Sequence, residues 1–194
     1  QLIFYHNKNT KKFFCMKIDL IAGARPNFMK ISPIIDAIKE QQEKKKNIMY
    51  RLIHTGQHYD HNMSSKFFEE LSIPFPDINL EAGGGSQSEQ TAKIMIGYEK
   101  ILNDFNPDYC LVVGDVTSTM ACSIVAKKNN IKVIHIEGGI RSFDLSMPEE
   151  INRMVTDSIS DYFYTTSEFA NDNLIKNGID HNRIVFVGNT MIDT

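Results

Sequence analysis

The sequence has few cysteines, and those it has are not arranged as a site. Its three cysteines, Cys15, Cys110 and Cys122, lack the spacing of a metal centre. An odd number also argues against a disulfide framework, which needs cysteines in pairs and an oxidising compartment. We therefore expect a protein of a reducing environment with a cytoplasmic location.

The chain also lacks an excess of positive charge and any long hydrophobic run. Its net charge is -3, and its 21 lysines and arginines are scattered, so no basic field attracts nucleic acid or anionic lipid. No apolar stretch approaches the roughly 20 residues that cross a bilayer. Neither a nucleic-acid-binding protein nor a membrane protein is predicted.

The first 15 residues have neither the apolar segment nor the small-residue cleavage site of a signal peptide. We expect residues 1–15 to be a non-native or flexible tail. Residues 16–194 are long enough, with the chain's apolar content of 42%, to form one domain with a core of its own.

From residue 17 onward, short β-branched runs alternate with stretches of helical periodicity. Strands are predicted at residues 17–23, 48–56, 107–115, 131–139, 161–168 and 183–190. Helices are predicted at residues 27–44, 62–71, 91–105, 117–130 and 169–178, and another beginning at Pro148. Nearly continuous apolar strands that alternate with helices indicate an α/β fold, a Rossmann-like doubly wound parallel sheet covered on both faces.

In such sheets, ligands bind outside the carboxyl ends of the strands. Four segments that follow predicted strands are rich in polar groups, and we expect them to meet at one edge. They are GARPNFMK (23–30), HTGQHYDH (54–61), GDVTST (114–119) and EGGIRSFD (137–144).

The first of these segments carries two cations, Arg25 and Lys30, where a helix begins. Two cations in the first turn of a helix favour an anion site. The segment has neither the glycine pattern of dinucleotide binding nor a Walker phosphate loop. The alternative is that both cations are solvated surface residues.

The second segment contains three histidines, His54, His58 and His61. A metal site is one interpretation, but Gly56 is expected to break the element between them, and no carboxylate or thiolate set completes the site. A polar turn or a ligand contact is favoured, and we expect neither a metal nor another cofactor. His135 lies inside a predicted strand and is expected to be a core histidine with satisfied hydrogen bonds.

Carboxylates follow the two most apolar strands. Asp115 and Glu137 are each placed where a buried strand emerges into a crevice, and such groups can divide the acid and base steps of a reaction. The alternative for Asp115 is a helix N-cap.

Two further acids, Glu149 and Glu150, follow Pro148 in the first turn of a helix. The positive end of the helix dipole would by itself explain them. Glu150 could also simply pair with Arg153.

Seven motifs together resemble the amino-terminal domain of the non-hydrolysing UDP-N-acetylglucosamine 2-epimerases. The resemblance runs from Met16 to Thr194 and rests on GARPNFMK, HTGQHYD, GDVTST, HIEGGIRSFD, MPEEINR, TDSISDYF and GNTMID, in this order. It implies the first half of a GT-B architecture, in which the nucleotide sugar lies between two Rossmann-like domains. The sequence matches only the first of these, so the second, nucleotide-binding domain is expected to be absent.

The resemblance also implies an activity and roles for residues. The family interconverts UDP-GlcNAc and UDP-ManNAc, precursors of cell-surface polysaccharide, by eliminating UDP and adding it back through a 2-acetamidoglucal. The implied catalytic acids are Asp115, Glu137 and Glu149, the implied substrate-binding residues are Arg25, Lys30 and Arg141, and Gln57 and His58 match a region that holds a second, regulatory UDP-GlcNAc in some members. Arg153 would orient the acids, bind phosphate or form an ordinary ion pair. A homodimer is expected of the complete enzyme.

Other functions stay open at this stage. A hydrolysing relative would release ManNAc and UDP through the same elimination, and a binding module would keep the fold without turnover. A GT-B glycosyltransferase is less favoured, because it would not need these acids near C2 of the sugar, and the exact sugar is open. We expect Asp115, Glu137 and Glu149 to share one crevice with Arg25, and the 194 residues alone to fold without epimerising.

Overall fold

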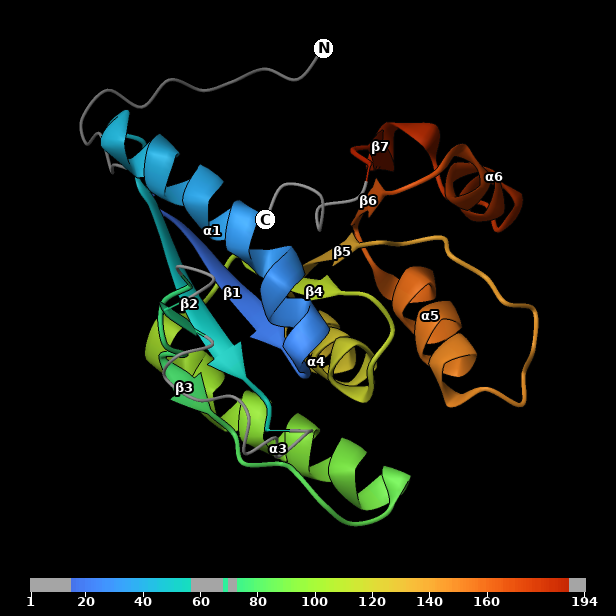
Figure 1. Cartoon of the computed structure of the whole chain (residues 1–194), viewed down its shortest axis with the longest axis horizontal. Helices are drawn as coiled ribbons and strands as arrows, with labels where there is room; N and C mark the ends of the chain where they lie inside the picture. Colours follow the sequence, from blue (N-terminus) through green and yellow to red (C-terminus); the bar gives the residue numbers. More distant parts are fainter. Residues whose placement is uncertain (1–14, 57–67, 70–72, 189–194) are drawn as a thin grey trace.

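The computed structural model describes residues 15–56, 68–69 and 73–188. The described chain forms one sheet of seven parallel strands in the order β3-β2-β1-β4-β5-β6-β7 (Figure 1). The order reverses beside β1, so the fold is the predicted doubly wound, Rossmann-like one. The predicted tail to residue 14, most of the predicted helix 62–71, and Gln57, His58 and His61 lie outside the described residues.

Every strand predicted from the sequence is present, and each ends earlier than its predicted range. The strands are β1 (Met16–Ala22), β2 (Ile48–His54), β3 (Ile78–Asn79), β4 (Tyr109–Val113), β5 (Lys132–Ile136), β6 (Tyr162–Thr165) and β7 (Ile184–Phe186). β3 was not predicted, since two residues give no periodic signal. Predicted strand ends such as Gly114 instead form turns, because that residue has a φ of 69° and leaves the sheet.

The helices also follow the predicted alternation. They are α1 (Arg25–Glu43), α3 (Gln87–Phe105), α4 (Thr117–Lys128), α5 (Pro148–Ile159), α6 (Glu168–Lys176) and the short 3-10 helix η1 (His181–Arg183). α3 begins four residues before the predicted start at residue 91. A capping box explains the difference: the Ser86 hydroxyl accepts from the Glu89 N–H, and the Glu89 carboxylate accepts from the Ser86 N–H.

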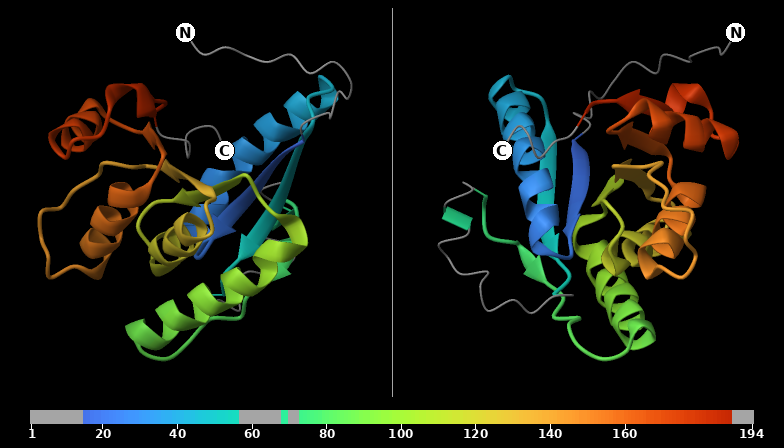
Figure 2. Two further views of the ribbon diagram at one scale, coloured as in Figure 1. Left: turned by 180° about the vertical axis from the view of Figure 1, so that it is seen from behind. Right: turned by 45° about the vertical axis from the view of Figure 1, so that its right-hand side comes forward.

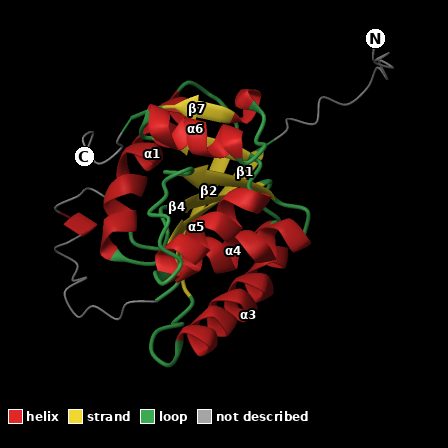
Figure 3. Ribbon diagram, turned by 90° about the vertical axis from the view of Figure 1, so that its right-hand side faces the viewer, coloured by secondary structure: helices red, strands yellow, loops and turns green. Residues whose placement is uncertain are grey.

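Helices cover the sheet from both sides, and each side has its own apolar cluster. α1 packs on one face, where Phe28, Ile31 and Ile35 meet β-strand residues such as Leu20 and Leu52. α3 and α4 pack on the other face, as the two views of Figure 2 show. In Figure 3, α5 lies beside α4, and α6 lies beside β7. None of the described helices combines the length and apolar character that a bilayer crossing requires.

The register of the strands brings their carboxyl ends to one level. Ala22 of β1 pairs with His54 of β2, and Val113 of β4 pairs with Ile136 of β5. The segments that follow these strands therefore emerge next to one another along a single edge. This edge carries the candidate site.

Candidate functional site

Asn27 joins the turn after β1 to the end of β4. Its side-chain oxygen accepts from the N–H groups of Gly23 (3.1 Å) and Ala24 (2.9 Å), while its amide donates to the Val113 carbonyl (3.1 Å). The side chain is buried, so these bonds are shielded from water. Asn27 thus sets where α1 starts relative to the neighbouring loop, a role that the sequence analysis missed.

Lys30 and Glu137 form an ion pair at this edge. The Lys30 Nζ lies 2.6 Å from the Glu137 Oε2, and the two side chains are only 16% and 11% exposed. The predicted position of Lys30 in the first turn of its helix is wrong: α1 begins at Arg25, so Lys30 lies in the second turn. Its charge is matched here by a protein carboxylate.

The backbone of Glu137 is held in a conformation that non-glycine residues rarely adopt. Its φ is 66°, in the left-handed region. Such a conformation costs about 1 to 2 kcal/mol for a residue with a Cβ, and it occurs preferentially at functional sites. It also turns the carboxylate toward Lys30 and toward Gly114, where an added Cβ would lie 3.5 Å from the Glu137 Oε2.

Asp115, directly after Gly114, is held by α5. Its carboxylate accepts a short hydrogen bond from Arg153, and its carbonyl accepts from the Asn152 amide at 2.8 Å. The N-cap interpretation of Asp115 is wrong, because Val116 occupies the N-cap of α4 and no side chain caps that helix. The Asp115 side chain remains 34% exposed, so it can be reached from the edge.

Glu150 forms an ion pair with Arg153 on the same helix. Its carboxylate is 2.9 Å from the Arg153 Nη1, which confirms the predicted pairing, and it also accepts from the N–H groups of Ser142 (2.9 Å) and Phe143 (3.1 Å). Burial alone raises the pKa of Glu150, but these hydrogen bonds outweigh it and lower the pKa to about 2. Glu150 is therefore a buried anchor for the loop after β5.

Two further candidates lie at the starts of helices. Glu149 and Arg25 lie in the first turns of α5 and α1, and both are exposed. The structure therefore pairs Lys30 with Glu137 next to Gly114, the residue before Asp115, and leaves Glu149 and Arg25 exposed.

Arg141 pairs with Asp157 of α5. It donates to the Asp157 carboxylate at 2.6 Å and to the carbonyl of Ile140 at 2.7 Å. The same Asp157 binds His135, which is fully buried and whose two ring nitrogens both have partners, as predicted for a core histidine. No sequence signal pointed to Asp157, since it lies 22 residues after His135.

The described part of the HTGQHYDH segment does not form a metal centre. His54 ends β2, is buried beside Phe28 at a ring distance of 5.3 Å, and has its pKa lowered by burial. Within the described ranges, no three His, Cys, Asp or Glu side chains gather closely enough to hold a metal ion.

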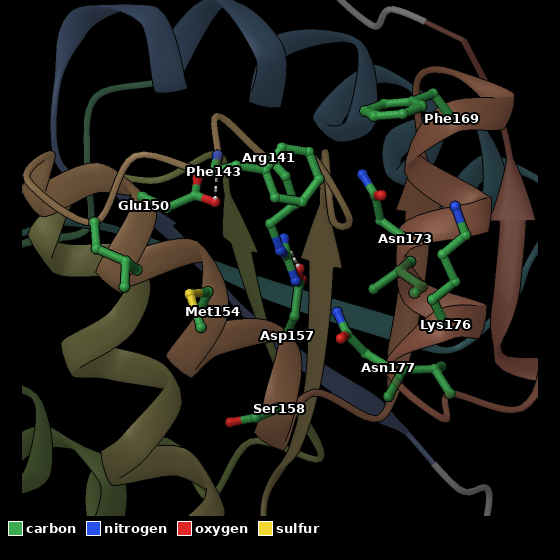
Figure 4. Close-up of a pocket in the computed structure, with 13 residues that line it drawn as sticks. Arg141, Phe143, Glu150, Met154, Asp157, Ser158, Phe169, Asn173, Lys176 and Asn177 are labelled. Carbon is green, nitrogen blue, oxygen red and sulfur yellow. Dashed lines mark hydrogen bonds and ion pairs between the residues drawn. The ribbon is translucent and has the colours of Figure 1, made fainter.

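A cavity of about 870 Å³ lies between α5 and α6, next to the loop that follows β5. Figure 4 shows Arg141 reaching Asp157 at its floor, with Phe143 and Phe169 on its upper rim. Glu150 also lines it, whereas Asp115, Glu137 and Glu149 do not. This cavity is therefore separate from the cluster of acids at the strand ends.

Residues 40–194 match the family model described as UDP-N-acetylglucosamine 2-epimerase. The chain belongs to this family. Among the curated relatives, the UDP-N-acetylglucosamine 2-epimerase of Methanocaldococcus jannaschii is 48% identical over 178 residues, which are 92% of this chain and 47% of that protein. The UDP-2,3-diacetamido-2,3-dideoxy-D-glucuronate 2-epimerase of Pseudomonas aeruginosa is 43% identical over 92% of this chain and 50% of its own length.

The solved structures of family members agree with the fold. The M. jannaschii UDP-GlcNAc 2-epimerase, solved in complex with UDP-GlcNAc and UDP, matches with a TM-score of 0.85 over 92% of this chain and 48% of that one. The predicted fold class, one half of a GT-B architecture, is confirmed by these epimerase neighbours. The chain spans about half the length of the curated epimerase relatives it matches.

Proposed function

We propose that this chain supplies the sugar-side half of an enzyme that interconverts UDP-GlcNAc and UDP-ManNAc. The observation that carries the proposal is that Glu137, paired with Lys30, lies beside Gly114, directly before Asp115, at the carboxyl edge of an epimerase-family domain. The M. jannaschii relative was solved with UDP-GlcNAc and UDP, which supports a UDP-sugar as the ligand.

The reaction needs two proton transfers at C2 and cleavage of the anomeric C–O bond. One carboxylate takes the C2 proton while UDP leaves C1, which produces the 2-acetamidoglucal. A second carboxylate returns a proton to the opposite face of C2 as UDP adds back to C1. We assign the proton transfers to Asp115 and Glu137, on neighbouring strand ends, because general acids and bases must lie within hydrogen-bond reach of the atoms they serve.

The other residues stabilise charge. Bond cleavage at C1 gives the sugar ring oxocarbenium character, and Glu149 at the rim would stabilise the developing positive charge. Lys30 and Arg153 hold Glu137 and Asp115 in place through ion pairs. Arg25 would bind the substrate's negatively charged diphosphate.

The decisive experiment uses the complete enzyme and UDP-GlcNAc in heavy water, followed at C2 by proton NMR. We expect UDP-ManNAc with deuterium at C2, and a loss of turnover of about a hundredfold or more in Asp115→Asn and in Glu137→Gln. Asp36→Asn, an exposed carboxylate on α1, is the matched control and should turn over normally. Normal turnover of either folded site variant would contradict the assignment.

The same assay separates the alternatives. Free ManNAc and UDP as the only products would identify a hydrolysing enzyme, and binding without any exchange at C2 would identify a binding module. Offering the UDP-diacetamido-glucuronate that names the P. aeruginosa relative in parallel tests the choice of sugar.

The 194 residues on their own should fold but not epimerise. Binding of the uridine and diphosphate supports the chemical step, and this binding would come from a second domain. Deuterium at C2 at about 1 per second or faster from these residues alone would overturn this point.

The resemblance adds a homodimer and a regulatory UDP-GlcNAc near Gln57 and His58 to the proposal. A cytoplasmic location and a role in polysaccharide precursor synthesis belong to it as well. Light scattering of the complete enzyme tests the dimer. The regulatory site is tested by the conversion of UDP-ManNAc to UDP-GlcNAc. We expect its rate to depend sigmoidally on added UDP-GlcNAc, and Gln57→Ala should abolish this dependence.

A further inference from the structure

His135 lies in β5 with none of its surface exposed, and each of its ring nitrogens faces an acceptor. The Nε2 is 2.8 Å from the carbonyl oxygen of Gly114, and the Nδ1 is 2.7 Å from the Oδ1 of Asp157. A carbonyl oxygen can only accept a hydrogen bond, so the Nε2 must carry a proton.

The second ring nitrogen, the Nδ1, faces the carboxylate of Asp157. Asp157 accepts on its other oxygen from the Gly139 N–H (3.1 Å) and from Arg141 (2.6 Å), so both of its oxygens are used as acceptors. Burial alone raises the pKa of Asp157, but the charges and hydrogen bonds of His135 and Arg141 outweigh it and keep the pKa below its usual value. With Asp157 ionised, the Nδ1 donates to its carboxylate, and His135 then carries a positive charge.

These bonds hold the backbone just before Asp115 and just after Glu137. Gly114 immediately precedes Asp115, and Gly139 lies two residues after Glu137. Gly114 and Gly139 have φ values of 69° and 83°, which glycine adopts readily, whereas Glu137 has a φ of 66°, which a residue with a Cβ rarely adopts. Surrounding contacts must hold such turns in place.

Gly138 and Phe163 pack closely against His135 and Asp157. A Cβ added at Gly138 would lie 3.3 Å from the His135 Nδ1 and from the Asp157 Oδ1, and 2.9 Å from the ring of Phe163. Phe163 of β6 and the loop backbone thus pack closely around the pair, whose side chains are only 1% and 4% exposed.

We propose that His135 and Asp157 form a charged clamp that sets the position of Asp115 relative to Glu137, and that they act as positioning residues for proton transfer at C2. The second part rests on the proposed function. The first part concerns only charge and backbone geometry, and it can be tested without substrate.

The charge is tested by NMR of the protein labelled with 15N-histidine. We expect both ring nitrogens of His135 to carry protons in the folded protein, and exposed His181 serves as the reference histidine. His135→Gln assigns the resonance. An unprotonated ring nitrogen of His135 in the folded protein would overturn the charged clamp.

The grip on the backbone is tested by amide hydrogen exchange. Asp157→Ala should speed exchange of the Gly139 amide at least tenfold, because this amide loses its acceptor. Asp157→Asn should slow it again, since an asparagine oxygen can accept from Gly139 while its amide donates to a now neutral His135. Unchanged exchange in Asp157→Ala would contradict the clamp.

The role in the reaction is tested in the complete enzyme. Asp157→Ala and His135→Gln should lower kcat by roughly tenfold or more while KM changes less than about threefold, since small displacements of reacting groups mainly slow chemistry. Asp157→Asn should recover most of the lost kcat, and His181→Gln is the surface control. Normal kcat in both folded clamp variants would refute positioning, whereas an inactive wild-type enzyme would refute the proposed function and leave the NMR and exchange results to decide the clamp.

Discussion

Two aspartate–arginine pairs of this domain have the same chemistry and opposite surroundings. Asp19 and Arg51 are paired across β1 and β2, with two contacts of 2.9 Å, and are 0% and 8% exposed. Asp115 and Arg153 pair at the carboxyl edge, where the Asp115 side chain is 34% exposed. The first pair is sealed under α3, and the second can be reached by a ligand.

Position relative to the strand decides the difference. Asp19 lies within β1, where Tyr98 also donates to it at 3.1 Å, and burial raises its pKa although Arg51 opposes this. Asp115 lies just beyond β4, where the backbone leaves the sheet. A charged pair inside a strand is part of the core, whereas one beyond the strand end is available for chemistry.

The largest effect should come from breaking the sealed pair. Arg51→Met leaves the Asp19 carboxylate buried without its cation, and we expect a loss of about 3 to 5 kcal/mol in the free energy of unfolding. Urea denaturation measures it. Lys127→Met, which breaks an ion pair about one third exposed, is the control and should cost less than about 1 kcal/mol. Equal losses in the two variants would remove the distinction between the pairs.

Breaking the edge pair should affect activity more than stability. Arg153→Met removes the cation from both Asp115 and Glu150, and we expect a cost of about 1 to 3 kcal/mol in stability. Turnover by the complete enzyme should fall roughly tenfold to a hundredfold, because Asp115 loses its orientation. Arg51→Met, measured per folded molecule, should keep normal turnover, and the opposite result would reverse the roles of the two pairs.

Acid should weaken the edge through Glu150. Its pKa is lowered from 4.5 to about 2 in the folded protein, so the stability it contributes is complete above about pH 4.5 and is lost as the pH falls toward 2. Glu150→Gln should lower stability at pH 6 and flatten its decline between pH 4.5 and 2. Denaturation midpoints across this range measure the effect, and parallel curves for the two proteins would contradict it.

The smallest effect concerns the strained backbone of Glu137. Glu137→Gly and Glu137→Ala both remove the carboxylate, but only alanine keeps a Cβ in the left-handed conformation. We expect the glycine variant to be more stable by about 1 kcal/mol, despite the greater flexibility of glycine in the unfolded chain. Thermal unfolding of the two variants measures the difference. A more stable alanine variant would show that the backbone there is not strained.

The location of the candidate acids could be anticipated, because parallel strands bring their carboxyl ends to one edge. That rule led from the sequence alone to Asp115, Glu137 and Lys30. It did not predict how they are held. Asn27 and Asp157 were not predicted, since their bonds to Val113 and His135 join segments far apart in the chain. No sequence pattern indicated the φ of Glu137.

The alternatives left open by the sequence were decided by packing. Glu149 and Glu150 are neighbours with the same chemistry, and the pattern placed both in the first turn of a helix. The structure exposes Glu149 and buries Glu150 against Ser142 and Arg153. A helix turns by about 100° per residue, so neighbouring side chains face different surroundings.

The sequence by itself determined the α/β alternation, the parallel sheet and the family, because apolar periodicity and ordered motifs are local properties of the chain. Only the tertiary structure decided which charges are sealed and which are accessible. It pairs Asp19 with Arg51 in the core, Asp115 with Arg153 at the edge, and His135 with Asp157 between the two loops. Those pairings join residues between 22 and 38 positions apart, and only the folded backbone brings them within hydrogen-bond distance.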